Sequence, residues 1–255
     1  MYPNELFFGV TLYEVMIVVG LLSAMLLYRR YSAWAGLSPR LHNLVIVSVT
    51  SAVVVGYLLG CLAQAFYNWM DGEPFSLTSS NTGSTFLGGM TGGLLLLLAV
   101  YFVGGRLFFP DREHIKKFPE MMDGLAVCVP VAHGFGRIGC LMAGCCYGKP
   151  SVHGFYFPAL GGRYLPTQLY EALFLFALAA VIWLVVRRKR GFGPPMYFIG
   201  YGVWRFFLEY LRGDARGKTV VPFLTPSQLV SVVLVAVGVA ILVIRAVRKR
   251  RKDGT

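Results

Sequence analysis

The sequence is short of charged residues, and of acidic ones above all. Only 14% of its 255 residues are charged, and twelve acidic residues stand against 24 basic ones. Hydrophobic residues make up 56% of the chain, far more than an ordinary soluble domain contains. This composition excludes a typical soluble enzyme and favours a protein whose main solvent is the lipid bilayer.

The chain also lacks internal repeats and low-complexity linkers. No unit of about 20 to 50 residues recurs, and no Ser-, Gln- or Pro-rich stretch divides the sequence. We therefore expect a single polytopic membrane domain over residues 1–255.

Apolar runs long enough to cross a membrane recur along the whole chain. A spanning helix needs about 20 apolar residues, and lipid offers no partners to open strands. Six runs approach or exceed this length, and a weaker seventh carries Asp123, His133 and Arg137. The seven runs are Phe7–Tyr28, Leu44–Phe66, Phe86–Val103, Met122–Met142, Gln168–Val186, Pro195–Leu211 and Leu229–Ile244. Because the first run lacks a basic leader and a small-residue cleavage site, we expect it to be retained.

The basic residues gather after alternate spans. Most of the 24 follow the first, third, fifth and seventh runs, in the groups 29–40, 106–117, 187–190 and 245–252. The positive-inside rule makes that side cytoplasmic. The sequence thus predicts an all-α integral membrane protein with seven transmembrane helices, the N-terminus outside and the C-terminus cytoplasmic. The net charge of +12 then reflects topology and contact with anionic lipid, and predicts no nucleic-acid partner.

Ionisable residues inside the sixth run suggest a binding site. Tyr201, Arg205, Glu209 and Arg212 follow spacings of four, four and three, so they share one helical face. An Arg205–Glu209 ion pair that only neutralises itself is one interpretation. It leaves Arg212, and Arg137 on another span, without an evident partner, and surplus arginine in a wet cavity is suited to phosphate.

Two further stretches carry polar or flexible residues at membrane depth. The segment 133–148 holds glycine at 134, 136, 139, 144 and 148, each costing roughly 1 kcal/mol in a helix, so we expect a broken or kinked segment lining a cavity. In the stretch 165–172, Gln168, Tyr170 and Glu171 together are typical of the lining of a polar binding site. Glu171 alone could simply complement a helix dipole.

Local signals mark three other places. Gly88 and Gly89 permit either close helix packing or close approach of a lipid headgroup. The segment 154–158 favours a short extended piece in an outer loop. Thr225 is a plausible N-cap, with Pro226 in the first turn of the last helix.

Four motifs together resemble those of prolipoprotein diacylglyceryl transferases. They are Gly136-Arg-Ile-Gly139, Pro166-Thr-Gln-Leu-Tyr-Glu171, Gly200-Tyr-Gly-x-x-Arg-x-x-x-Glu-x-x-Arg212 and Leu224-Thr-x-x-Gln-x-x-Ser231. They occur in the order and spacing of that family, and the similarity includes Tyr13 and the glycines at 88 and 89.

The resemblance implies a bacterial inner (cytoplasmic) membrane enzyme that moves diacylglyceryl from phosphatidylglycerol to the lipobox cysteine thiol of a preprolipoprotein. It implies that Arg137 and Arg205 clamp the phosphate and that Glu209 holds Arg205. Residues implied to shape the headgroup site are Tyr13, Gly88, Gly89, Gly136, Gly139, Gln168, Tyr170, Glu171, Tyr201 and Arg212. The nucleophile belongs to the substrate, and no cofactor is expected.

The chain departs from the family pattern where a base is expected. Leu87 stands where the family usually has histidine, Cys140 replaces an asparagine, and Cys145 replaces a glutamate. The remaining interpretations are that His133 or a thiolate such as that of Cys145 deprotonates the acceptor, or that the acceptor or reaction differs.

The five cysteines divide into two groups. Cys61 and Cys128 lie in apolar runs and are most simply core residues. Cys140, Cys145 and Cys146 lie toward the outer side, where a disulfide, plain packing or a catalytic or acyl-carrying thiol are all open. Neither the spacing nor a complete ligand set with His133 recommends zinc, so we predict no metal.

Three other functions remain open at this point. One is a divergent paralogue with another acceptor, and another is a non-enzymatic transporter or lipid-binding protein whose arginines hold an anion. A membrane thiol oxidoreductase rests on the vicinal cysteines alone, without a C-x-x-C motif.

Overall fold

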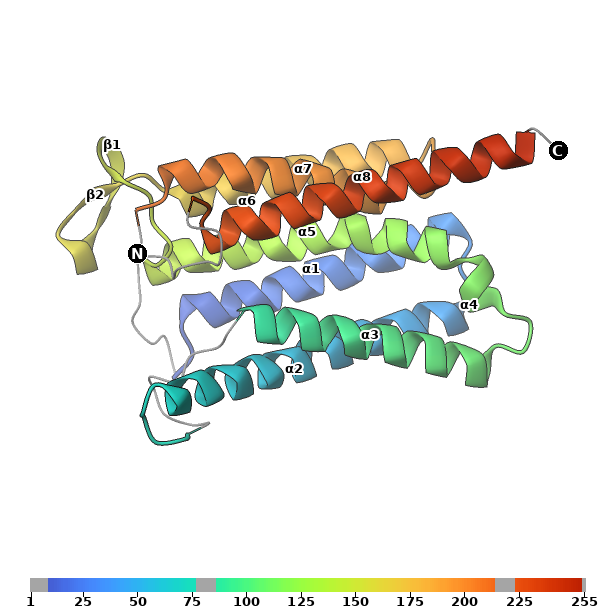
Figure 1. Ribbon diagram of the computed structural model, residues 1–255, viewed down its shortest axis with the longest axis horizontal. Helices are drawn as coiled ribbons and strands as arrows, with labels where there is room; N and C mark the ends of the chain where they lie inside the picture. The colour runs from blue at the N-terminus through green and yellow to red at the C-terminus, as the bar shows by residue number, and fades with distance from the viewer. Residues whose placement is uncertain (1–8, 77–85, 214–222, 254–255) are drawn as a thin grey trace. The chain divides into compact units, whose positions relative to one another are not determined.

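A computed structural model gives the fold of residues 9–76, 86–213 and 223–253 (Figure 1). The described chain is mostly helical, with a small two-stranded hairpin. The helices are α1 Leu12–Ala35, α2 Pro39–Met70, α3 Phe86–Phe108, α4 Glu113–Lys116, α5 Phe118–Ala143, α6 Thr167–Val186, α7 Gly193–Leu208 and α8 Pro226–Asp253. The hairpin pairs β1 Pro150–Phe157 with β2 Gly162–Tyr164 across the 3₁₀ turn η1 Pro158–Leu160, and a second 3₁₀ turn, η2 Glu209–Leu211, extends α7.

Six of these helices are long and apolar enough to cross a membrane, namely α1, α2, α3, α5, α6 and α8. They confirm a multi-pass membrane protein. Helix α7 has 16 residues, fewer than the roughly 20 that a straight span requires. The expected seventh span and the orientation of the termini stay predictions. The extended segment expected at 154–158 is confirmed as far as Phe157, where β1 ends and η1 begins.

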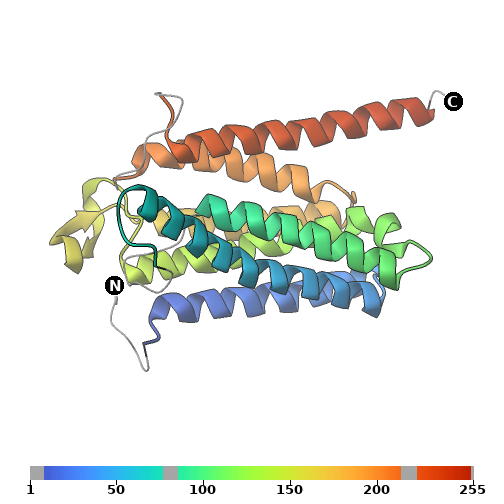
Figure 2. The ribbon, with the colours of Figure 1, turned by 60° about the horizontal axis from the view of Figure 1, so that its bottom comes forward.

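The chain divides into two compact units, one of residues 1–31 with 122–255 and the other of residues 32–121. In the second unit, α2 and α3 lie side by side in both ribbon views (Figures 1 and 2). A Cβ on Gly89 would lie 2.9 Å from the Gly56 carbonyl oxygen, and one on Gly93 would lie 2.9 Å from that of Ala52. Glycine therefore lets the two backbones touch, which supports the packing interpretation of Gly88 and Gly89.

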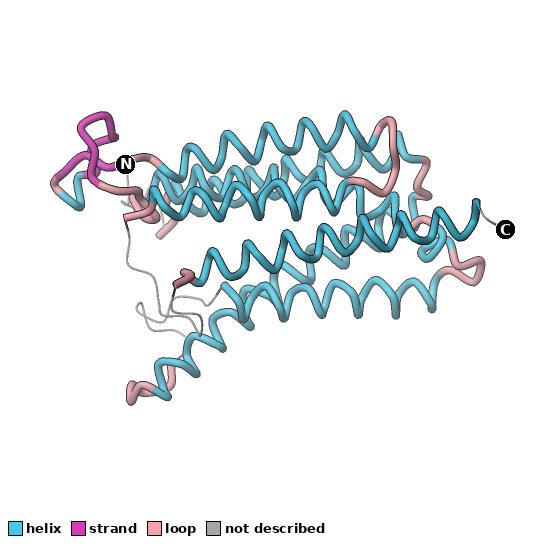
Figure 3. Tube along the Cα trace, turned by 45° about the horizontal axis from the view of Figure 1, so that its top comes forward, coloured by secondary structure: helices cyan, strands magenta, loops and turns pink. Residues whose placement is uncertain are grey.

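The first unit contains α5, α6, α7, α8 and most of α1, and the hairpin, magenta in Figure 3, lies at one end of its helices. Tyr31 is fully buried, and its ring lies 6.0 Å from that of Trp183 in an edge-on contact. The buried Asp123 carboxylate accepts hydrogen bonds from the backbone N–H groups of Gly191 and Gly193. This carboxylate therefore holds the connection into the N-terminus of α7, where negative charge is favourable.

Helix α5 is continuous to Ala143, so the break expected in the segment 133–148 does not fall at glycines 134, 136 or 139. Close packing explains two of them. A Cβ on Gly134 would lie 2.7 Å from the Phe176 ring, and one on Gly139 would lie 3.1 Å from Tyr13. The helix ends instead at Gly144, whose φ of 75° is in the left-handed region that favours glycine.

The start of α8 follows the sequence expectation. The Gln228 N–H donates to Thr225 Oγ1 at 3.2 Å, and the Thr225 N–H donates to Gln228 Oε1 at 3.0 Å. This reciprocal pair satisfies two backbone donors at the helix end. The Thr225 cap is confirmed.

The α2–α3 contact generates a stability prediction. Gly93→Ala should cost about 1–3 kcal/mol, because the added methyl group meets backbone that cannot rotate away. Thermal unfolding in detergent measures the loss. Gly104→Ala is the matched control in the same helix, because its nearest contact is the rotatable Leu44 Cδ1 methyl group. Equal melting temperatures for the two variants would show that the backbone contact is not tight.

Candidate active site

A fully buried carboxylate lies at the centre of the first unit. Glu171, on α6, is 0% exposed and lies 3.0 Å through Oε2 from Arg137 Nε on α5. Its other oxygen, Oε1, accepts a hydrogen bond from the Tyr201 hydroxyl on α7 at 2.8 Å. The sequence left Arg137 without a partner, and Glu171 is that partner. Because this carboxylate joins three helices, the dipole-only interpretation of Glu171 is wrong.

Arg205 on α7 continues the network. Its Nη2 lies 2.8 Å from Glu209 Oε2 and also donates to Ser227 Oγ on α8 at 2.9 Å. Its Nε lies 4.0 Å from Glu171 Oε1. The expected Arg205–Glu209 pair is therefore present, but it is joined to the Arg137–Glu171 pair rather than isolated.

His133 lies at the edge of this network. Its Nε2 is 3.9 Å from Glu171 Oε1, and its ring packs edge-on against Tyr201 with centroids 5.0 Å apart. The side chain keeps 28% of its surface exposed, whereas Glu171 keeps none. His133 is thus a partly accessible titratable group beside the buried carboxylate.

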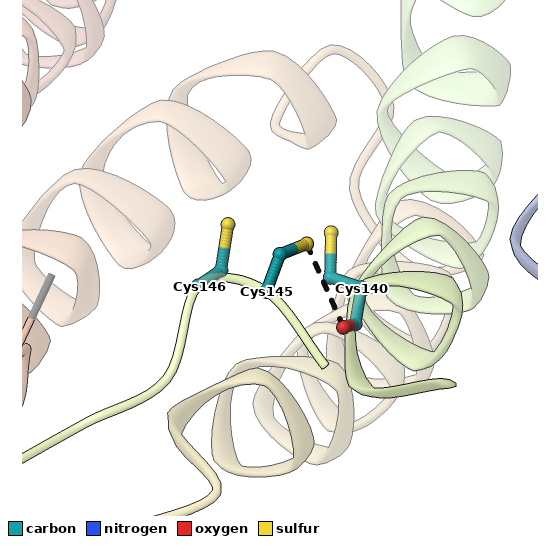
Figure 4. Close-up of side chains that lie close together, drawn as sticks. All are labelled: Cys140, Cys145 and Cys146. Atoms are coloured by element: carbon teal, nitrogen blue, oxygen red, sulfur yellow. Dashed lines mark hydrogen bonds between the residues drawn. The ribbon is translucent and has the colours of Figure 1, made fainter. Parts of the chain in front are cut away.

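The chain after α5 folds back as a tight turn that carries Cys145 and Cys146, beside Cys140 in the last turn of α5 (Figure 4). Gly144 ends the helix, and the Cys145 N–H donates to the Cys140 carbonyl oxygen at 3.1 Å. Cys146 has a φ of 63°, a left-handed conformation that is uncommon outside glycine. The Sγ atoms of Cys140, Cys145 and Cys146 all lie within 4.8 Å of one another, and all five cysteines of the chain are free thiols.

Two side chains at the start of α6 hold this turn. Thr167 Oγ1 donates to the Cys146 carbonyl oxygen at 3.0 Å, and Gln168 Nε2 donates to the Cys145 carbonyl oxygen. Both Thr167 and Gln168 are fully buried. The cysteine turn is therefore attached to the same helix that carries Glu171 about one turn further on.

Arg212 approaches the turn from the end of η2. Backbone hydrogen bonds from Lys149 to Leu211 and from Gly213 to Tyr147 hold the two segments together. Hydrogen bonds from the Cys140 and Cys145 thiols, and then from the Arg212 guanidinium, lower the pKa of the Cys146 thiol. From the sequence, Cys145 was the named candidate for a base. In the structure, Cys146 is the thiol that contacts the Arg212 guanidinium.

Tyr13, Gly136 and Tyr170 belong to the same unit as this network. Tyr13 on α1 lies within electrostatic range of Arg137 and the three thiols. Gly136 faces Ile17 at an ordinary contact distance of 3.6 Å, and half-buried Tyr170 makes no hydrogen bond through its side chain to another described residue. Gly88 and Gly89 belong to the other unit, and the side chain of Leu87 lies outside the described residues.

Sequence reasoning missed two contributors, Thr167 and Ser227. Both lie inside recognised motifs, Thr167 between Pro166 and Gln168 and Ser227 in the stretch 224–231. Their roles depend on contacts with residues about twenty positions away, at Cys146 and Arg205 respectively. A small hydroxyl side chain at a helix start is the only local signal, and it also fits simple capping.

Comparison with known proteins agrees with the motifs. The family model described as prolipoprotein diacylglyceryl transferase matches residues 4–244. A phosphatidylglycerol–prolipoprotein diacylglyceryl transferase 2 from Clostridium perfringens is 30% identical over 97% of this chain and 96% of its own length. A protein named phosphatidylglycerol–prolipoprotein diacylglyceryl transferase from Clostridium tetani is 33% identical over 93% of this chain and 94% of its own length. One of the same name from Pseudomonas aeruginosa is 32% identical over 91% of this chain and 87% of its own length.

The central carboxylate generates a stability prediction. Glu171→Gln should cost about 3–5 kcal/mol, because it leaves Arg137 buried without its opposite charge. The midpoint of thermal unfolding in detergent measures this cost. Glu73→Gln, the same change at an exposed position, should leave the midpoint unchanged, and a similar small effect of both changes would contradict the central role of Glu171.

Proposed function

Because this chain belongs to the prolipoprotein diacylglyceryl transferase family, we propose that it transfers the diacylglyceryl group of phosphatidylglycerol to the lipobox cysteine thiol of a preprolipoprotein. The names of its relatives contain both substrates, phosphatidylglycerol and prolipoprotein. The observation that carries the proposal is the buried Arg137–Glu171–Arg205 network.

The charges of this network suit a phosphodiester. Arg137, Arg205 and Arg212 bring three positive charges, whereas Glu171 and Glu209 bring two negative ones. The surplus of one positive charge matches the single negative charge of phosphatidylglycerol. Arginine is the residue best suited to hold phosphate oxygens, because its planar fork donates two parallel hydrogen bonds.

Each remaining residue has a proposed role around this anion. Glu171 orients Arg137, and Glu209 and Ser227 orient Arg205, so both guanidiniums are held before the lipid arrives. Tyr201 fixes Glu171 by its hydrogen bond. Tyr13, Gly136, Gly139, Gln168 and Tyr170 shape the headgroup site.

The chemical step is a displacement at the glyceryl carbon bonded to phosphate. The acceptor sulfur forms a C–S bond to that carbon, the C–O bond to phosphate breaks, and glycerol phosphate leaves with the electron pair. The phosphodiester carries one negative charge and the released monoester two, and the thiol proton accounts for the difference. Arg137 and Arg205 stabilise the charge that gathers on the leaving phosphate.

An acceptor thiol must lose its proton before or during attack. The half-buried His133 lies 3.9 Å from Glu171 and is one candidate for this base. The thiols of the cysteine turn, Cys145 among them, are the others. A thiol of ordinary pKa is a modest nucleophile at neutral pH, because only the thiolate attacks.

An apolar groove lies along α8 and along α7, the helix that carries Arg205. It has a volume of about 710 Å³ and is lined by Gly202, Phe206, Val235, Val239 and other apolar side chains. Such a surface suits acyl chains. Arg205 itself is not among the residues that line the groove.

We further propose that the chain acts as a single domain in the bacterial inner membrane, with α7 and η2 completing seven spans. The basic groups after alternate spans support an external N-terminus and a cytoplasmic C-terminus.

The proposed topology gives a direct test. A fluorescent-protein fusion at the C-terminus should fluoresce and an alkaline phosphatase fusion there should be inactive, because the first matures in the cytoplasm and the second outside it. Fusions in the connection between α6 and α7 should behave alike. Active phosphatase at the C-terminus would contradict the seven-span arrangement.

The proposed activity is tested on purified protein with phosphatidylglycerol and a lipobox peptide. Arg137→Lys and Arg205→Lys should each lower kcat/KM by about 10²–10³, because lysine keeps the charge but loses the planar fork. Glycerol phosphate release and thioether formation are followed together.

Arg163→Lys is the matched control, because Arg163 is exposed on β2. It should keep the wild-type rate. Lipid binding without thioether, in folded wild-type protein, would overturn the transferase proposal and favour another acceptor or a non-enzymatic anion-binding role.

A further inference from the structure

The cysteine turn groups three sulfurs in a way that the arginine network does not explain. Cys145 and Cys146 are neighbours in sequence, and neighbouring side chains of an extended chain point to opposite faces. The left-handed backbone at Cys146 brings both sulfurs to one side, next to the Cys140 sulfur at the end of α5 (Figure 4). The turn is thus shaped to bring three thiols together.

The distances match a metal site better than a bond between two of the sulfurs. A tetrahedral ion with metal–sulfur bonds of about 2.3 Å places its sulfurs about 3.8 Å apart. The three Sγ atoms lie within 4.8 Å of one another, so small side-chain rotations suffice to close around an ion. We propose that Cys140, Cys145 and Cys146 bind one thiophilic divalent ion of the zinc type, whose open fourth position takes the thiol of the acceptor.

The surroundings have the features of a supported ligand set. Thr167 and Gln168 hold the carbonyl groups of Cys146 and Cys145, which orients two of the ligands. The Arg212 guanidinium contacts Cys146, so a cation lies beside these thiolate ligands. Cys145 is exposed, whereas Cys140 and Cys146 are half-buried, so one side of the cluster is open to a fourth ligand.

This inference rests on the proposed transferase function for its role, although the metal site itself does not. A thiol bound to a divalent ion is deprotonated outright. The acceptor sulfur would replace water on the ion, release its proton to solvent and attack the glyceryl carbon as a metal-bound thiolate. The ion then supplies the activation that the family histidine, replaced here by Leu87, is expected to supply elsewhere.

Metal content is the first measurement. Protein purified with reductant and without chelator is loaded with Zn²⁺, desalted and analysed by mass spectrometry of the metal, with an expected content of about one ion per chain. Cys140→Ser and Cys146→Ser should lower this content at least about tenfold, whereas Cys61→Ser and Cys128→Ser, outside the cluster, should keep it. Folding of each variant is checked by its elution profile and melting temperature.

Cobalt gives a second readout that needs no variant. Wild-type protein loaded with Co²⁺ should show sulfur-to-cobalt charge transfer and the strong visible absorption of tetrahedral cobalt. A lipobox peptide should shift these bands, and the same peptide with serine in place of cysteine should not. Thr167→Ala should weaken metal affinity about tenfold without removing a ligand.

The outcomes separate the two proposals. Wild-type protein that retains no Zn²⁺ and gives no cobalt–sulfur band overturns the metal site, whatever its transferase activity. Metal that binds at one ion per chain without any peptide-dependent band shift overturns the acceptor-binding role. Metal binding with the expected peptide shift but without thioether product supports the site while contradicting the proposed transferase function.

Discussion

The pairing of the Glu171 carboxylate with Arg137 is the interaction on which the first unit depends. Taking either charge from water into a membrane bundle is costly, and only a close partner makes it tolerable. Glu171 provides that partner while also accepting from Tyr201 and lying near Arg205. A single carboxylate thereby sets the relative positions of α5, α6 and α7, and its remaining contacts determine which arginine surfaces stay available to an anion.

The polar network and the cysteine turn share one support. Thr167, Gln168 and Glu171 all belong to the first two turns of α6. The first two hold the backbone of the turn, and the third holds a guanidinium on α5. A change at the start of α6 therefore acts on the thiols and on the arginines together, which is why neither group can be understood from its own stretch of sequence.

Sequence reasoning succeeded where the signal is local or repeats over a whole helix. Long apolar runs identified the multi-pass membrane protein, the Thr225 cap marked the start of α8, and motifs in register identified the family. It failed where the answer lies between distant segments. The partner of Arg137 is 34 positions away on another helix. The glycines of α5 were interpreted as the sites of a break or kink, because the residues they pack against, such as Phe176, cannot be read from their own stretch. The thiol cluster was equally hidden, because it depends on a left-handed residue that is not glycine.

The connection between α6 and α7 has a consequence for motion within the first unit. The Gly191 N–H donates to the Asp123 carboxylate at the start of α5, and the Gly191 carbonyl accepts from Arg245 on α8. Charged groups from two helices thus fix this connection through its backbone. Segments held in this way open rarely and exchange their amide hydrogens slowly. Asp123 lies at the opposite end of α5 from the cysteine turn, whose backbone Thr167 and Gln168 hold. The unit is therefore fixed at both ends of α5, and slow amide exchange is expected at Gly191 and Gly193.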